Sequence, residues 1–175
     1  MGNRLLQDCV VKTMNIRDAQ LTDLPTIVAI YNASIPGRMA TADLEPISVE
    51  SRLQWYGEHS PGHRPVWVIE REEQILGWLS FQSFHNRPAY EATAEISIYI
   101  HPICQGQGIG KKLLQAAIDR SPELGLNRLM ALIFAHNFPS IHLFQKFGFQ
   151  QWGYLPGIAN LDGDERDVVI LGRHL

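Results

Sequence analysis

The stretch ISIYIHPICQGQGIGKKLL, residues 96–114, decides the architecture of this chain. It begins inside an alternating apolar run over residues 92–100, which predicts a strand with one apolar and one polar face. His101 and Pro102 end that strand, and a turn rich in glycine follows. Apolar residues then recur at helical spacing, at Ile109, Leu113, Leu114, Ala117 and Ile118. The sequence therefore predicts a strand, a glycine loop and a helix as one unit.

A glycine-rich turn between a strand and a helix exposes backbone N–H groups at the positive end of the helix dipole, where a pyrophosphate can bind. Two nucleotide-binding patterns do not fit this turn. The P-loop needs Gly in place of Gln105 and Ser or Thr in place of Lys112, and the dinucleotide pattern needs its third glycine one place beyond Gly110. A glycine turn that closes the unit without any ligand is the remaining alternative.

Further elements are predicted on both sides of this unit. A strand over residues 14–19 precedes a helix that Thr22 is expected to cap, and Ser48 is expected to cap a second helix. The remaining strands are predicted at 66–70, 74–81, 128–135, 149–155 and 166–171, and the remaining helix at 139–147. Residues 14–175 are expected to form one domain, and residues 1–13 a disordered or non-native extension.

The composition excludes several classes of protein. The chain has 175 residues, of which 45% are hydrophobic and 19% charged, as is typical of a globular domain. Its net charge is −3, so nucleic acid is not an expected partner. Neither a membrane span nor a signal-peptide core is present, which favours a cytoplasmic protein without membrane contact. Cys9 and Cys104 are expected as free thiols, and the Pro-Gly pair between His59 and His63 argues against a metal site.

Two blocks of the sequence resemble one enzyme family. Residues 98–110 are similar to the Gln/Arg-x-x-Gly-x-Gly/Ala signature of the GCN5-related N-acetyltransferases. Residues 137–149 are similar to that family's later motif, an Asn near the cofactor arm followed by a closing aromatic-Gly-Phe. The loop over residues 84–90, ahead of Glu95, narrows the resemblance to the phosphinothricin acetyltransferase-like branch. The resemblance implies an α/β fold, with a mixed, mostly antiparallel and splayed sheet flanked by helices on both faces.

The resemblance also implies acetyl-CoA as the acetyl donor. Backbone N–H groups from Gln105 to Lys111 would hold the pyrophosphate, and the pantetheine would pair with the strand near Ile98 like an added strand. Asn137 would hold a pantetheine amide, or would instead bond its own backbone at the start of a loop. The residues expected to bind acetyl-CoA are Ile98, Tyr99, Ile100, Gln105, Gly106, Gln107, Gly108, Ile109, Gly110, Lys111, Asn137, Ser140 and Phe144.

Acetyl transfer to an amine requires a neutral nucleophile, whereas an α-amino group (pKa about 8) and a lysine (pKa about 10.4) are largely protonated at neutral pH. Glu95 lies on the polar face of the strand, where the resemblance implies a catalytic base; a solvated or salt-bridged carboxylate is the alternative. Backbone N–H near Ile98 would polarise the thioester. Many relatives have a tyrosine acid where this chain has Phe144, which leaves Tyr99 or Tyr90 as substitutes.

The amine substrate is expected to contact Tyr31, Arg87, Tyr90 and Thr93. The guanidinium of Arg87 suits the carboxylate of an amino acid, and an exposed loop arginine is the alternative. The resemblance implies acetylation of a small amino acid or an analogue such as phosphinothricin, methionine sulfone or methionine sulfoximine. It also implies that the enzyme is a homodimer and that the reaction requires no metal. The alternatives are acetylation of a protein N-terminus or lysine, and a CoA-binding module without catalysis.

Overall fold

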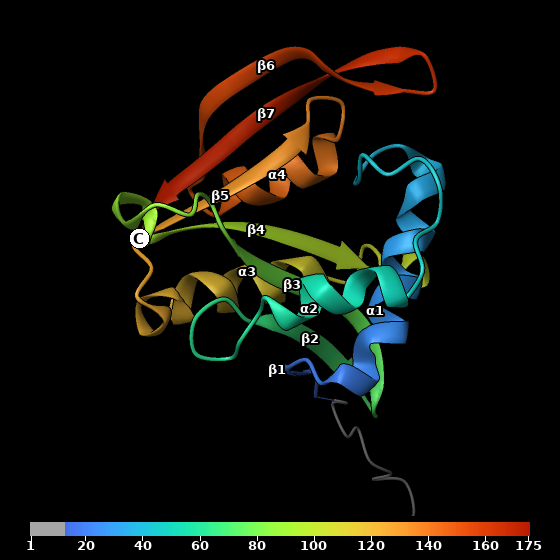
Figure 1. The fold of residues 1–175 in the computed structure, drawn as a ribbon, viewed down its shortest axis with the longest axis vertical. Helices are drawn as coiled ribbons and strands as arrows, with labels where there is room; N and C mark the ends of the chain where they lie inside the picture. Colours follow the sequence, from blue (N-terminus) through green and yellow to red (C-terminus); the bar gives the residue numbers. More distant parts are fainter. Residues whose placement is uncertain (1–12) are drawn as a thin grey trace, which may run out of the picture.

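The computed structural model describes residues 13–175, whose seven strands form one sheet and which contain four α-helices (Figure 1). The strands are β1 (Asn15–Asp18), β2 (Val66–Arg71), β3 (Gln74–Ser83), β4 (Thr93–Ile100), β5 (Arg128–Phe134), β6 (Gln150–Leu161) and β7 (Asp164–His174). The helices are α1 (Leu24–Ser34), α2 (Leu53–Gly57), α3 (Ile109–Arg120) and α4 (Phe138–Lys146). Apart from Thr13, the extension expected over residues 1–13 lies outside the described residues.

The sheet divides at its one parallel pair of strands. Its strand order is β1-β2-β3-β4-β5-β7-β6, and every neighbouring pair except β4 and β5 is antiparallel. β4 and β5 are joined by only three residue pairs, which match residues 93–95 with residues 128–130. Beyond these pairs the two strands diverge, as Figure 1 shows. The expectation of a mostly antiparallel, splayed sheet is confirmed.

Each face of the sheet carries its own helices. The larger core packs α3 and Phe144 of α4 against apolar side chains of β2 to β5 and β7. The smaller core packs α1 against Val66, Val68 and Trp78, with Trp55 of α2 at its margin. The two faces of β4 follow the predicted alternation, since Ile98 contacts the larger core and Tyr99 the smaller one. Helices on both faces are therefore confirmed.

Three element boundaries differ from the sequence prediction. Thr22 is not a helix cap, because a 3-10 turn (Leu21–Asp23) precedes α1 and Gln20 and Asp23 cap it reciprocally. Ser48 does accept the N–H of Ser51 at 3.2 Å, but the residues that follow it form a 3-10 turn (Glu50–Arg52) and not the predicted helix. The α-helix α2 begins only at Leu53 and is short. The last two strands are also longer than predicted, because they pair far beyond the core as a two-stranded hairpin.

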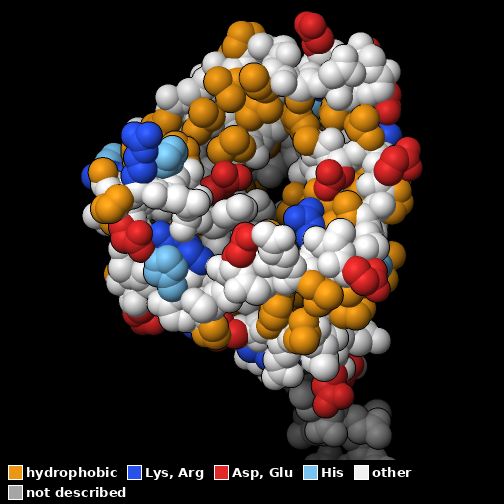
Figure 2. Space-filling view, viewed as in Figure 1, with side chains coloured by type: hydrophobic (Ala, Val, Ile, Leu, Met, Phe, Trp, Pro, Cys, Tyr) orange, Lys and Arg blue, Asp and Glu red, His pale blue; other side chains and the backbone are white. Residues whose placement is uncertain are grey.

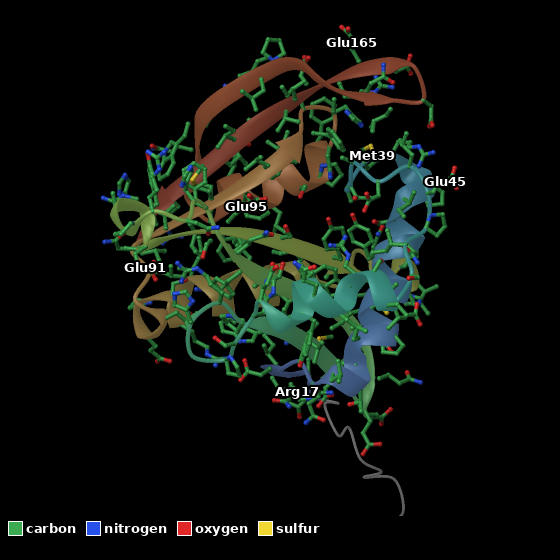
Figure 3. The ribbon with its side chains drawn as sticks, in the orientation of Figure 1. Arg17, Met39, Glu45, Glu91, Glu95 and Glu165 are labelled. Carbon is green, nitrogen blue, oxygen red and sulfur yellow. The ribbon has the colours of Figure 1, made fainter. Side chains whose placement is uncertain are left out.

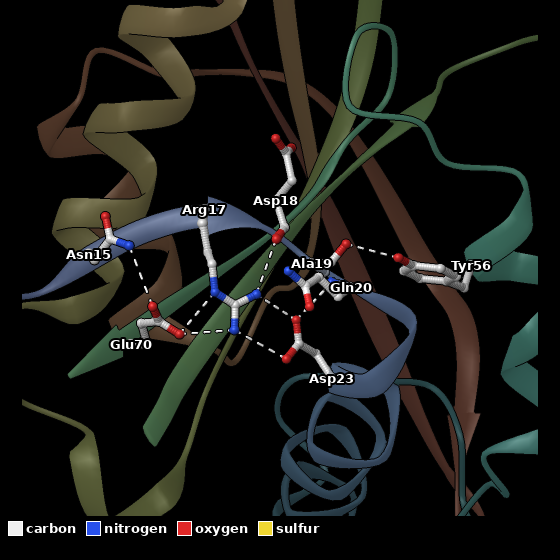
Figure 4. Close-up of polar contacts among 8 residues, drawn as sticks. All are labelled: Asn15, Arg17, Asp18, Ala19, Gln20, Asp23, Tyr56 and Glu70. Carbon is white, nitrogen blue, oxygen red and sulfur yellow. Dashed lines mark hydrogen bonds and ion pairs between the residues drawn. The ribbon is translucent and has the colours of Figure 1, made fainter. Parts of the chain in front are cut away.

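A polar network fixes β1 to the start of α1 (Figure 4). Arg17 donates to both carboxylate oxygens of Asp23, at 2.6 and 3.2 Å, and its Nε donates to Glu70 at 3.0 Å. Asp23 also accepts the backbone N–H of Gln20 at 2.7 Å. Burial raises the pKa of Asp23, but the hydrogen bonds from Arg17 and Gln20 outweigh it and leave the pKa below its ordinary value. The carboxylate is therefore stabilised in its charged form.

Replacement of Asp23 by Asn should lower the free energy of unfolding at neutral pH by about 2 kcal/mol, because hydrogen bonds to a charged group are lost and Arg17 keeps only one of its two carboxylate partners, Glu70. A depressed pKa stabilises the fold above the unfolded pKa of about 3.9, and this stabilisation is lost as the pH falls through the folded value. Urea unfolding at several pH values checks this. A deficit that stays constant from pH 7 to pH 3 would contradict it.

Among residues 13–175, no helix is both long and apolar enough to cross a bilayer. Within the same residues, no group of three or more His, Cys, Asp or Glu side chains is arranged to hold a metal ion. Cys104 has a free thiol and packs against the larger core.

Candidate functional site

The divergence of β4 and β5 opens a cleft in the middle of the sheet. Residues that the sequence analysis selected from distant parts of the chain meet on its walls, namely Ile98, Tyr99, Asn137, Ser140 and Phe144. Beyond Glu95 the edge of β4 that faces β5 has no pairing with it. Backbone N–H and C=O groups on that edge are therefore available to an extended ligand, as at any edge strand.

The glycine loop lies between β4 and α3, next to the cleft. Gly106 and Gly108 have φ angles of 75° and 76°, in the left-handed region that favours glycine. Gly108 starts α3 without a side-chain cap, so the first N–H groups of this 12-residue helix remain free for an anion. Ile109 and Gly110 have packing roles: Ile109 is buried in the core, and a Cβ on Gly110 would approach Leu143 to 3.3 Å.

Asn137 connects the cleft to the segment after α1. Its Oδ1 accepts the N–H of Ser140 at 3.2 Å and so caps α4, while its Nδ2 donates to the carbonyl of Met39 at 2.9 Å. The predicted local bond of Asn137 is thus present, together with a long-range bond. His136 contacts the carbonyl of Arg38 at 2.8 Å. The segment 38–43 therefore closes one end of the cleft.

A cluster of hydroxyl and charged groups lies at this closed end. Tyr31 donates to Asp43 at 2.5 Å and also bonds Thr41, and its ring lies 5.0 Å from that of Tyr99. The guanidinium of Arg52 lies 4.8 Å above the Tyr31 ring. Burial, followed by the contact with Asp43, raises the pKa of Tyr31, so its hydroxyl stays neutral.

Tyr99, rather than Tyr90, is the tyrosine on the cleft. Its hydroxyl donates to the carbonyl of Ala40 at 3.3 Å, and its ring stacks on Trp78 at 4.6 Å. Burial raises the pKa of Tyr99 strongly, so the phenol stays protonated. Tyr90 is 41% exposed and packs on Phe84.

Glu95 lies on β4 on the same face as Ser97 and Tyr99 and directly opposite Gln82 of β3. Burial raises the pKa of its carboxyl above the ordinary value, which makes the carboxylate a stronger base. Figure 2 shows a hollow in this face with acidic side chains at its rim, and in Figure 3 Glu95 and Met39 lie on opposite sides of the opening. Thr93, one step further along the same face, is buried.

The predicted amine-binding residues do not all come together within one chain. Tyr31 lies beside Tyr99, whereas Arg87 and Tyr90 lie in the exposed loop that precedes Thr93. Six residues of strand at about 3.3 Å each separate Thr93 from Tyr99, a span of about 20 Å. Arg87 and Tyr31 are therefore at opposite ends of β4.

A basic groove next to the glycine loop was missed by the sequence analysis. It has a volume of about 1200 Å3 and contains Lys111 of α3, His142 and Lys146 of α4, and Arg173 and His174 of β7. No Asp or Glu of residues 13–175 lines it. Lys111 was predicted for its place in the loop, but only the packing of α3, α4 and β7 unites it with the other four. The groove attracts anions such as phosphate groups.

Comparisons with known proteins agree with this geometry. The family described as "Acetyltransferase (GNAT) family" matches residues 27–149. The chain is 50% identical over 163 residues to the YwnH protein of Bacillus subtilis (strain 168), named provisionally as a phosphinothricin acetyltransferase, with coverage of 93% of this chain and 99% of that protein. It is 32% identical over 158 residues to the L-methionine sulfoximine/L-methionine sulfone acetyltransferase of Salmonella typhimurium, with coverage of 90% and 92%.

A similar solved structure contains acetyl-CoA. It is a GNAT superfamily phosphinothricin acetyltransferase from Sinorhizobium meliloti in complex with AcCoA. This structure superposes with a TM-score of 0.86 at 30% identity, covering 93% of this chain and 89% of that chain. The fold is therefore that of an acetyltransferase over nearly the whole described chain.

Proposed function

Because this chain belongs to the acetyltransferase (GNAT) family, we propose that it transfers the acetyl group of acetyl-CoA to the amino group of a small amino acid or amino acid analogue. The methionine sulfone and phosphinothricin chemistry in the names of its relatives supports this acceptor class. The observation that carries the proposal is the position of Glu95, a half-buried carboxylate on the strand whose edge opens next to an uncapped helix N-terminus.

The donor fits the groups along the cleft. The free N–H groups of the glycine loop and of the first turn of α3 would hold the pyrophosphate. The open edge of β4 near Ile98 and Ile100 would pair with the pantetheine amides. Lys146 and the other cations of the basic groove suit the remaining phosphate of the donor.

The reaction needs a base more than it needs an acid. Glu95 takes the proton from the acceptor amine, directly or through water, as the nitrogen attacks the thioester carbon and the carbon–sulfur bond breaks. Backbone N–H near Ile98 would stabilise the oxygen on which charge develops. Phe144 supplies no proton, but a thiol of pKa about 8.5 is a tolerable leaving group, and Tyr99 has the hydroxyl on the cleft wall.

Release of free thiol from acetyl-CoA tests the function. The panel contains L-amino acids, methionine sulfone, phosphinothricin and short peptides. Release with a small amino acid supports the proposal. Release with peptides alone would favour acetylation of protein amines, and acetyl-CoA binding without release on any acceptor would favour a CoA-binding module.

We also propose a homodimer, supported by an apolar surface on β5 and β6. Leu132 of β5 is 46% exposed, and it shares one face of the sheet with the half-buried Ile170 of β7 and Leu155 of β6. Figure 2 shows hydrophobic side chains gathered over this part of the sheet. Light scattering at micromolar concentration should give about twice the chain mass of 19.8 kDa. Leu132→Lys should shift the mass toward one chain. A wild-type mass of a single chain would refute the dimer.

A further inference from the structure

A second cavity lies on the Glu95 face of the sheet, at the end of β3. It has a volume of about 560 Å3 and is lined by Glu58, His59, His63 and Arg64 of the α2–β2 connection and by residues 81–86. One of these, Gln82, pairs directly with Glu95, and directly paired residues point to the same face. The cavity therefore begins next to the proposed base.

The strand register brings Arg64 into the same row. Val66 pairs with Ser80, and the N–H of Phe81 donates to the carbonyl of Pro65 at 3.0 Å. The same register continued by one more residue places Arg64 opposite Gln82. Arg64, two residues before β2, is thus level with Gln82 of β3 and Glu95 of β4. Two strand spacings of about 4.8 Å put the backbones of Arg64 and Glu95 about 10 Å apart.

Arg64 has a buried charge without a carboxylate partner. It is only 3% exposed, and its two Nη atoms donate to the carbonyls of His63 and Glu91 at 3.0 and 2.6 Å. Its Nε has no hydrogen-bond partner within residues 13–175, and the Glu91 carboxylate lies instead 2.7 Å from His63. Buried cations are normally paired with an anion. Within residues 13–175 no carboxylate forms an ion pair with Arg64, although Glu58 also lines the cavity.

His59 adds a second unsatisfied polar group to this wall. Its Nδ1 lies 2.6 Å from the carbonyl of Trp55, and its Nε2 is buried without a hydrogen-bond partner in the described chain. Burial lowers the pKa of His59, so its ring is neutral. The cavity is thus lined by one buried cation and one neutral imidazole, together with Glu58 at its edge.

We propose that this cavity receives the carboxylate of an amino acid acceptor on Arg64 and so holds the acceptor's amino group against Glu95. This inference rests on the proposed function and names the group that selects the acceptor. Each Nη of Arg64 has a second hydrogen beyond the one it donates to a backbone carbonyl, and a guanidinium is the donor that best matches a carboxylate. An amine without a carboxylate leaves the buried cation unpaired and is therefore a poor acceptor.

The test compares L-methionine sulfone with 3-(methylsulfonyl)propylamine, which is the same acceptor without its carboxylate. In Arg64→Gln the KM for methionine sulfone should rise at least about tenfold, while the KM values for the propylamine and for acetyl-CoA stay within about twofold. Equal increases in the KM for both acceptors, as a general folding defect would cause, would overturn the proposal. If Arg64→Gln does not fold, Arg64→Lys should show the same selective loss to a smaller degree.

Arg166→Gln is the matched control, because it removes a half-exposed arginine of the β6–β7 hairpin that does not line the cavity. It should leave both acceptors unchanged. A selective loss with Arg87→Gln and none with Arg64→Gln would move the carboxylate to Arg87 and overturn the assignment. Wild-type protein that acetylates neither acceptor would refute the acceptor class itself, whereas activity with equal losses would refute only the role of Arg64.

Discussion

Glu95→Gln should lower kcat by about 10²–10⁴-fold with little change in the KM for acetyl-CoA, because the variant keeps the shape of the side chain and loses only the base. The wild-type kcat/KM should fall as the pH drops through the raised pKa of Glu95, since the protonated carboxyl cannot accept a proton. That limb should be absent from the variant, and the limb set by protonation of the acceptor amine should remain. Steady-state rates from pH 5 to pH 9 measure both effects.

Glu165→Gln is the control for this experiment. Glu165 is exposed on the β6–β7 hairpin, far from Glu95 in Figure 3, and its replacement changes the net charge by the same amount. It should leave the rate and the pH profile unchanged. An unchanged rate in Glu95→Gln would remove Glu95 from the mechanism.

Gly108→Ala should raise the KM for acetyl-CoA at least about tenfold, because a Cβ at the start of α3 keeps a phosphate away from the free N–H groups. Nothing in the described chain lies within 4 Å of that Cβ, so the only internal cost is the left-handed conformation, about 1–2 kcal/mol. Initial rates at varied acetyl-CoA give the KM, and urea unfolding gives the stability.

Gly125→Ala separates strain from ligand binding. Gly125 has a φ of 71° against 76° for Gly108, and its added Cβ also meets nothing within 4 Å. It lies beyond the other end of α3, after the 3-10 turn Ser121–Leu124. Both variants should lose similar stability, and only Gly108→Ala should lose affinity for acetyl-CoA. Equal KM values in the two variants would show that the loop does not bind the donor.

Local pattern was sufficient for the central unit of the fold. The alternation over residues 92–100, the glycine turn and the helical stripe after Ile109 predicted β4, the loop and α3 because each depends on neighbours in sequence. Thr22 was misjudged as a cap because a 3-10 turn, fixed by Arg17 and Asp23, precedes the helix. The length of the final hairpin was underestimated because its outer part is exposed on both faces and shows no alternation.

Candidate site residues that belong to a sequence motif were predictable, whereas residues brought together only by the pairing of strands were not. The glycine loop, Asn137 and Glu95 belong to sequence blocks that resemble a family. No local sequence pattern singles out Arg64, because its position level with Gln82 and Glu95 results from the pairing of β2, β3 and β4. An arginine in sequence predicts an exposed residue, and only the structure shows this one buried.

The three residue pairs between β4 and β5 have a mechanical consequence. They join a half-sheet of β1 to β4 to a half-sheet of β5, β7 and β6, and this seam has the fewest backbone pairs between any two adjacent strands. A ligand that pairs with the open edge of β4 and also contacts β5 would bridge the two halves. A ligand that binds the folded state and not the unfolded state also raises the stability of the fold by mass action. We therefore expect the seam to be more rigid with the cleft occupied than with the cleft empty.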